Sequence, residues 1–252
     1  MDDATSEVYY AQLVAQEDTR GVLRALREVV EERGLFCALY SDRASHFYLT
    51  PRAGEIVDRF RLTQVGRCMQ QLGIGMIAAY SPQARGRSER AFRTWQGRLP
   101  QELRVRGLVS VAEANTFLRE TYIREFNETF SVCAAQAGTA FVALKRTDLE
   151  LIFSLQHERV VNRDNTVSFA NLCLQIERAK WRSTLSGCRV TVYEHLSGML
   201  SVGYGPHIIA QYDAQGKPMV LNKVKTRRQS QTEKQLSNRT IDVLQKADTL
   251  MC

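Results

Sequence analysis

The sequence predicts an α/β domain followed by a small all-β barrel and a basic tail. In the first half, apolar runs alternate with amphipathic segments, as they do in a sheet whose strands are joined by helices. Short strand-like segments then follow one another at close spacing, which favours a small barrel. We place the α/β domain at residues 1–135, the barrel at residues 148–222 and the tail at residues 223–252.

The predicted α/β domain contains three strands. Residues 6–14 mix β-branched, aromatic and apolar residues as a strand does. Residues 36–41 and 73–80 are continuous apolar runs, which predict strands buried on both faces of a parallel sheet.

Two helices alternate with these strands. Apolar residues recur at helical spacing in residues 22–30, between a cap at Asp18 or Thr19 and a stop at Gly34. Residues 63–72 form the second predicted helix and lead into the last strand.

Two further helices follow the last strand. A long helix is predicted from residue 86 to 106, with a kink at Pro100. Ser110 and Glu113 form a capping box that opens another helix, and this helix closes near Asn127.

The predicted barrel is built from short segments separated by turns. Its strands are residues 159–161, 167–170, 188–194, 199–204 and 208–212.

The composition is that of a folded protein. Of 252 residues, 44% are apolar and 24% are charged, so the chain can bury a core. No apolar stretch is long enough to span a bilayer and no signal peptide is recognisable, so we expect a cytoplasmic protein without a membrane partner. The six cysteines form no C-x-x-C pair, which favours reduced, structural thiols.

Basic charge is concentrated in two segments. Seven arginines stand against two glutamates from Arg85 to Arg106, and seven basic against three acidic residues follow from Lys223 to the end. Such concentration suits a protein that binds backbone phosphates and releases their counterions. A solvated helix face and a solubilising tail would give the same pattern, and charge alone does not exclude them.

Two carboxylates stand where metal chemistry would need them. Asp42 follows a predicted buried strand, and Glu89 lies near the start of the long basic helix. Carboxylates that converge at a sheet edge can bind two divalent ions about 4 Å apart, which activate a water or a 3′ hydroxyl for phosphodiester exchange. Taken singly, Asp42 is better explained as a turn-initiating aspartate, and Glu89 as a glutamate favoured by the helix dipole.

The surroundings of both carboxylates resemble the integrase core of bacterial insertion-sequence transposases of the DDE type. Four motifs occur in the family's order: residues 39–47 around Asp42, residues 63–64 with 72–74, residues 81–92 around Glu89, and Phe126-Asn127-x-x-Phe130. The resemblance covers residues 1–135, and the barrel more loosely resembles the C-terminal barrel of these transposases.

This resemblance implies a ribonuclease H-like integrase core that cuts and joins DNA strands with two Mg²⁺ or Mn²⁺ ions, in DNA transposition and integration. Asp42 would be the second acidic ligand and Glu89 the third. The implied partners are transposon ends and target DNA, with homo-oligomers in the intact relatives and a nucleoid-associated location.

The long helix would supply the DNA contacts. Arg93 and Gln96 follow Glu89 by one and two helical turns and project from roughly the same face. Gln96 stands where relatives carry a basic residue, so Arg93 and Arg98 are the preferred phosphate contacts. The full expected DNA-binding set is Arg85, Arg87, Arg90, Arg93, Gln96 and Arg98. Trp95 would stack on a base or pack in the core, and its apolar neighbours along the helix favour the core.

One departure from the family concerns the first acidic ligand. In the family that aspartate lies on the first strand, whereas residues 1–5 here resemble the end of the second strand. We therefore expect an N-terminally truncated, inactive transposase fragment, in which Asp2 and Asp3 do not replace the missing ligand. The alternative is a non-catalytic DNA-binding module derived from a transposase, and a ribonuclease H-like nuclease outside transposition is a weaker third possibility. A third convergent acidic residue would separate the first two.

Overall fold

The structure is a computed structural model that describes residues 1–50, 56–58, 60–80, 82–145, 148–177 and 182–220, with the backbone alone at 82–85 and 87. Contacts within the chain define a first compact unit from Met1 to Met219. The predicted basic tail lies outside the described residues. The predicted domain boundaries within the first unit stay a prediction. None of the described helices is long and apolar enough to cross a membrane.

The two helices predicted from apolar spacing are confirmed as α1 (Thr19–Arg33) and α2 (Gln64–Leu72). The Asp18 carboxylate accepts a hydrogen bond from the Gly21 N–H at 2.7 Å, which caps the start of α1. Gly34 ends α1 at φ 101°, a conformation that glycine adopts without steric cost. A Cβ at this position would lie 2.4 Å from the Val142 carbonyl oxygen, so the close approach of that backbone also requires glycine.

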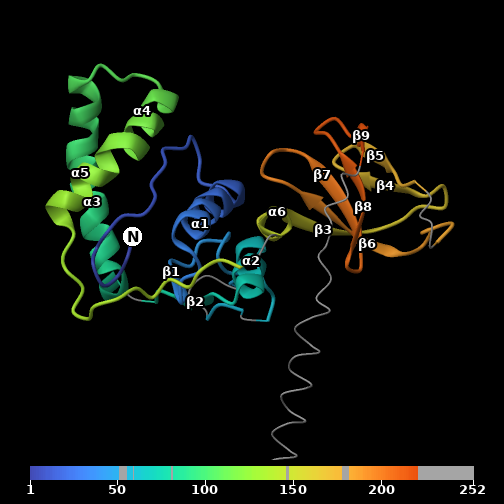
Figure 1. Cartoon of the computed structure of the whole chain (residues 1–252), viewed down its shortest axis with the longest axis horizontal. Helices are drawn as coiled ribbons and strands as arrows, with labels where there is room; N and C mark the ends of the chain where they lie inside the picture. Colours follow the sequence, from blue (N-terminus) through green and yellow to red (C-terminus); the bar gives the residue numbers. More distant parts are fainter. Residues whose placement is uncertain (51–55, 59, 81, 146–147, 178–181, 221–252) are drawn as a thin grey trace, which may run out of the picture. The chain divides into compact units, whose positions relative to one another are not determined.

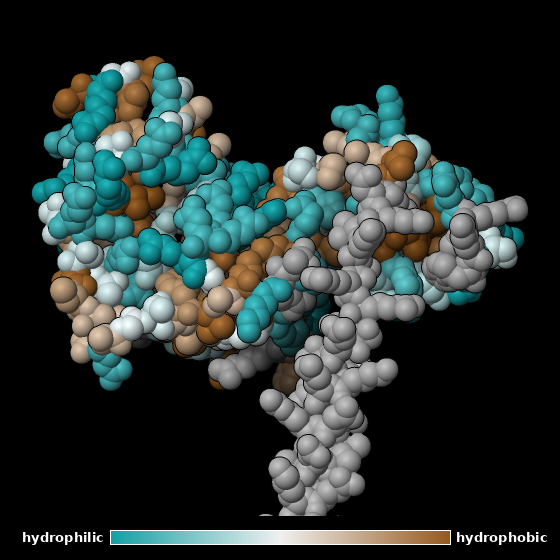
Figure 2. Space-filling model, in the orientation of Figure 1, coloured by the Kyte–Doolittle hydropathy of each residue, from teal (hydrophilic) through white to brown (hydrophobic). Residues whose placement is uncertain are grey.

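Strands β1 (Ala38–Ser41) and β2 (Gly75–Ala78) form a parallel pair, as predicted, with Leu39 beside Met76. Their predicted burial on both faces is wrong. Helices α1 and α2 pack against the face that carries Leu39 and Met76, whereas Tyr40 and Ile77 on the opposite face are 48% and 49% exposed. In Figure 2, hydrophobic side chains accordingly reach the surface where β1 and β2 lie in Figure 1. Among the described residues, this small sheet has a helical cover on one face only.

Residues 6–14 do not form the predicted strand. Instead, two asparagine side chains bind the backbone of this segment. Asn127 accepts from the Val8 N–H at 2.8 Å and donates to the Val8 carbonyl at 2.9 Å. Asn115 binds Leu13 in the same way, at 2.7 and 2.9 Å. This segment is therefore extended, as its composition suggests, but it has no neighbouring strand. Side-chain amides form the hydrogen bonds to its backbone instead.

Helices α3, α4 and α5 carry the second core of the chain (Figure 1). The long basic helix α3 (Pro82–Val105) contains Pro100 and begins before its predicted start. The capping box is confirmed at the start of α4 (Val111–Phe117), and a π-helical turn, η1 (Leu118–Tyr122), joins α4 to α5 (Ile123–Phe130). The predicted apolar stripe of this region is buried, at Ala114, Phe117, Leu118, Tyr122 and Phe126.

The remaining strands form an open antiparallel sheet and a separate hairpin (Figure 1). The sheet has the order β3-β6-β7-β8-β9, with β3 (Leu155–Val160), β6 (Arg189–Glu194), β7 (Leu200–Tyr204), β8 (His207–Tyr212) and β9 (Pro218–Met219). The hairpin consists of β4 (Thr166–Phe169) and β5 (Leu172–Gln175) and shares one hydrophobic core with the sheet.

The predicted closed barrel is therefore wrong for the described residues. The hairpin strands pair with each other, and β3 and β9 are left as the two edges of the sheet. Strands β5 and β9 were absent from the sequence prediction. The mixed α/β character of the chain is confirmed.

Side chains of α1 and α2 hold the connection from α6 (Leu149–Ile152) into β3. Arg27 forms an ion pair with Glu150 at 2.7 Å. Gln64 donates to the Gln156 carbonyl at 2.8 Å and accepts from its N–H at 3.0 Å, so this side chain pairs with the start of β3 as a neighbouring strand would.

Candidate nucleic-acid interface and acidic site

Asp42 lies directly after β1, at the carboxyl end of the parallel pair. The two strands end side by side there, with Ser41 beside Ala78. One carboxylate oxygen of Asp42 accepts a hydrogen bond from the Ala44 N–H at 3.1 Å, the turn-forming contact expected of an aspartate in this position. The guanidinium of Arg43 lies 5.2 Å from the centre of the Tyr80 ring, so residues that follow β1 and β2 meet at this edge.

Glu89 lies in the second turn of α3 and is exposed. Helix α3 begins at Pro82, shortly after β2 ends at Ala78, so it starts from the edge at which Asp42 lies. Glu89 is the seventh residue after Pro82, which corresponds to about 10 Å along the helix axis. That the two carboxylates share one cleft stays a prediction.

The DNA-binding residues predicted on α3 are exposed where their side chains are described. Arg90, Arg93, Gln96 and Arg98 all face solvent. Arg90 donates to the Gly86 carbonyl at 3.1 Å, which holds its guanidinium along the helix. The side chains of Arg85 and Arg87 lie outside the described part of the structure.

Two residues of α3, Trp95 and Arg98, contact aromatic rings of η1 and α5. The guanidinium of Arg98 lies 5.0 Å from the centre of the Phe130 ring. Trp95 packs edge to face against Tyr122 and Phe126, with ring centres 5.0 and 5.2 Å apart, so its predicted place in the core is confirmed. Phe92, one turn before Trp95, is 65% exposed instead.

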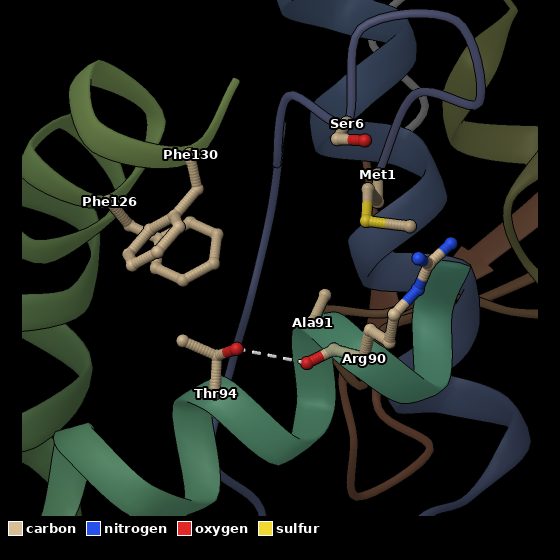
Figure 3. A pocket seen from close by; sticks show the side chains of 7 residues that line it. All are labelled: Met1, Ser6, Arg90, Ala91, Thr94, Phe126 and Phe130. Atoms are coloured by element: carbon tan, nitrogen blue, oxygen red, sulfur yellow. Dashed lines mark hydrogen bonds between the residues drawn. The ribbon is translucent and has the colours of Figure 1, made fainter. Parts of the chain in front are cut away.

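A pocket of about 250 Å³ opens beside α3 (Figure 3). The rings of Phe126 and Phe130 project from α5 toward Ala91 and Thr94 of α3. The other lining residues are Met1, Ser6 and Arg90. Its lining is mixed, with the apolar Met1, Ala91, Phe126 and Phe130 beside the polar Ser6, Arg90 and Thr94.

The roles of Asn115 and Asn127 were not predicted from the sequence. Each carries an amide within a helix whose apolar residues recur regularly, and each uses both amide groups on one residue of the segment 6–14. The signal was a polar residue on or beside an apolar stripe, since a partly buried amide needs partners for its donor and its acceptor. Asn127 was recognised only as part of a family motif.

Within the described residues, no group of three or more His, Cys, Asp or Glu side chains is placed to hold a metal ion. The donor set that sequence analysis predicts is therefore the pair Asp42 and Glu89.

The chain is similar to known transposases, although no family model matches it. A Sinorhizobium fredii protein named as a transposase, y4bF, is 28% identical over 209 residues, which cover 82% of this chain and 45% of that protein. The transposase for insertion sequence IS1202 of Streptococcus pneumoniae is 31% identical over 173 residues, which cover 69% of this chain and 37% of that protein. The chain spans less than half the length of either relative. By this similarity over most of its own length, the chain belongs to the bacterial insertion-sequence transposases.

Proposed function

We propose that this chain is a DNA-binding part of an insertion-sequence transposase that acts in DNA transposition. The observation that carries the proposal is helix α3, whose described arginines are exposed and which starts at the sheet edge where Asp42 lies. Two relatives named as transposases match the chain over most of its length, which supports the same conclusion. The proposed partners are transposon ends and target DNA, bound by a homo-oligomer of the intact protein.

DNA binding by α3 is expected to be electrostatic. Arg90 and Arg93 lie three residues apart, so both reach the same side of the helix and suit neighbouring phosphates of one strand. Contacts with phosphates carry no sequence information of their own, so binding should depend little on sequence. Each phosphate that is neutralised adds about 0.9 to the slope of log affinity against log salt.

We propose Mg²⁺ or Mn²⁺ as the cofactor of the acidic site, held by Asp42 and Glu89. The donor chemistry fits, because both side chains offer the hard oxygen ligands that these ions prefer. A bound ion would stabilise negative charge on a scissile phosphate. The role of the two side chains is to hold that ion at the end of β1 and beside the basic face of α3.

Strand transfer requires more than this pair supplies. A two-metal site relies on several carboxylates, because two divalent ions carry four positive charges. Asp42 and Glu89 suit one ion, so we expect the 252-residue chain to bind DNA without joining its strands. This favours a binding function over a ribonuclease H-like integrase activity of the chain itself.

The proposal is tested with the purified chain and a fluorescent duplex. Anisotropy titrations at several salt concentrations should show affinity that falls steeply with salt and changes little between duplex sequences. A flat salt dependence would contradict the proposal. A strand-transfer assay with Mg²⁺ and Mn²⁺ tests the second part: metal-dependent joining that disappears in Asp42→Asn would show that the chain is catalytic.

A further inference from the structure

A second pocket, of about 410 Å³, is lined by other residues of α5 than the first pocket. The end of α1, residues 7–9 and one side of η1 and α5 line it. Three of its lining residues are arginines, Arg33, Arg119 and Arg124, and one is the aromatic Tyr9. None of these residues belongs to the DNA-binding set predicted on α3.

The floor of this pocket is fixed by contacts within the chain. Asn127 holds the backbone of Val8 through two hydrogen bonds, of 2.8 and 2.9 Å. Arg33 forms an ion pair with Glu7 at 3.0 Å, and its guanidinium lies 5.0 Å from the centre of the Tyr9 ring. The segment that carries Glu7 and Tyr9 is therefore ordered before any ligand arrives, which lowers the entropic cost of binding.

The walls of the pocket carry excess positive charge. Arg119 and Arg124 are exposed, and neither forms an ion pair with an acidic side chain of the described residues. Of the two lining carboxylates, Glu7 is already ion-paired with Arg33, so the rest of the lining holds two guanidiniums and one carboxylate, that of Glu128. Burial raises the pKa of the nearby Tyr10, and the positive charge of Arg119 opposes that rise.

We infer that this pocket binds a phosphate group of a DNA strand, at a place separate from the arginines of α3. The guanidiniums of Arg119 and Arg124, which form no ion pair within the described residues, offer the planar donor geometry that phosphate oxygens accept. The volume exceeds that of a bare phosphate and is within the range of sites that hold nucleotide-sized ligands. Tyr9 supplies an aromatic ring beside that site, as in proteins that bind a nucleic-acid strand through its charge and its bases together.

This inference rests on the proposed DNA-binding function, and separate variants distinguish the two. The test measures the binding of a fluorescent single strand and a fluorescent duplex to the full chain by anisotropy, at several salt concentrations. The pocket variant is Arg119→Ala with Arg124→Ala, and the α3 variant is Arg90→Ala with Arg93→Ala. Arg163→Ala with Arg189→Ala is the matched control, because it removes the same charge from exposed positions in the β-sheet region.

The pocket variant should bind DNA about tenfold more weakly than the control at equal salt, since it loses two charge-assisted contacts. Its slope of log affinity against log salt should be smaller by about 2, and replacement of both arginines by lysine should restore most of that slope. If the pocket variant keeps the affinity and salt slope of the wild type while the α3 variant loses affinity, the inferred phosphate site is wrong and the proposed function stands. Unchanged binding in both variants would overturn both.

Inorganic phosphate separates a nucleic-acid site from a site for a free anion. Phosphate should compete weakly with DNA for the wild-type chain, and the pocket variant should lose this competition together with its DNA affinity. A pocket variant that loses phosphate competition but keeps full DNA affinity would show a free-anion site and overturn the inference. Circular dichroism and Trp95 fluorescence check that each variant retains its fold.

Discussion

The side-chain amide of Asn127 closes a pair of hydrogen bonds on the backbone of Val8, accepting from its N–H at 2.8 Å and donating to its carbonyl at 2.9 Å. The pair joins positions 119 residues apart in the chain. It also fixes Val8, whose side chain is buried with Leu99 and Phe126 in the core that α3 and α5 share. One amide therefore holds an extended segment against a helix without a β-ladder.

Replacing Asn127 by alanine should lower the free energy of unfolding by about 1–3 kcal/mol, because the Val8 N–H and carbonyl lose their partners. Asn127→Asp keeps the acceptor for the Val8 N–H but brings a second acceptor oxygen against the Val8 carbonyl, so it should also be less stable than the wild type near neutral pH. Urea titrations followed by circular dichroism measure both. Thr129→Ala, two residues away on the exposed side of α5, is the control and should change little. Equal stability of Asn127→Ala and the wild type would show that the two hydrogen bonds between Asn127 and Val8 do not stabilise the fold.

Two buried tyrosines should respond in opposite ways to loss of the hydroxyl. The Tyr122 hydroxyl is buried and has no hydrogen-bond partner among the described residues, whereas the Tyr212 hydroxyl donates to the Gln175 carbonyl at 2.6 Å. Tyr122→Phe should raise the free energy of unfolding by about 1 kcal/mol, since it removes an unsatisfied polar group and keeps the ring. Tyr212→Phe should lower it by a similar amount. Chemical denaturation of the two variants tests the contrast. If both substitutions destabilise the protein, the Tyr122 hydroxyl is not an unsatisfied group.

Cys68 should be the least reactive of the described thiols. Burial raises its pKa from 9.0 to about 12, although the neighbouring Arg67 opposes the shift. The nucleophilic thiolate is therefore scarce in the folded state. At pH 8, iodoacetamide should modify the exposed Cys37, Cys133 and Cys173 first and reach Cys68 only after unfolding. Mass spectrometry of tryptic peptides gives the order, and early modification of Cys68 would contradict its burial.

The same shift makes a prediction about pH and stability. Folding favours the neutral thiol, so its contribution is fully present below the unfolded pKa of 9.0 and is lost as pH rises toward the folded value of about 12. Stability should decline over that range. The decline should be smaller in Cys68→Ala, whose overall stability is expected to be lower at all pH values because of the cavity that it leaves. A decline of equal size in both proteins would mean that Cys68 does not contribute.

Local sequence signals predicted the helices well. The cap at Asp18, the stop at Gly34 and the capping box at Ser110 and Glu113 all stand where the sequence indicated, because each depends on contacts within one turn. The core position of Trp95 was predicted from its neighbours on the same helix. Such features need no knowledge of distant parts of the chain.

Features that depend on distant partners were less predictable. An apolar run such as the one that contains Tyr40 predicts burial. The run itself does not show whether another element covers the second face of the strand. Residues 6–14 have the composition of a strand, and only the distant amides of Asn115 and Asn127 explain why they are not in a ladder. The predicted barrel was wrong for the same reason. Closure requires pairing of β3 with β9, which are about 60 residues apart in the sequence, and local patterns do not indicate such pairing.

In the candidate site, too, local features were predicted from the sequence and contacts between distant segments were not. The sequence indicated that Asp42 and Glu89 follow the ends of β1 and β2, and the order of elements agrees with that. Their proposed metal ion and the side chains of Arg85 and Arg87 stay predictions. The pocket with Arg33, Arg119 and Arg124 could not be foreseen, because its residues come from segments that are brought together only by the fold.

The most direct test of the central claim is the salt dependence of duplex binding by the chain in which Arg90 and Arg93 of α3 are both replaced by alanine. We predict that affinity falls and that the slope of log affinity against log salt becomes smaller by about 2, one phosphate contact for each arginine. The control, Arg163→Ala with Arg189→Ala, should keep the slope of the wild type. If the α3 variant instead binds the duplex with the affinity and salt slope of the wild type, α3 is not the DNA-binding surface and the account is contradicted.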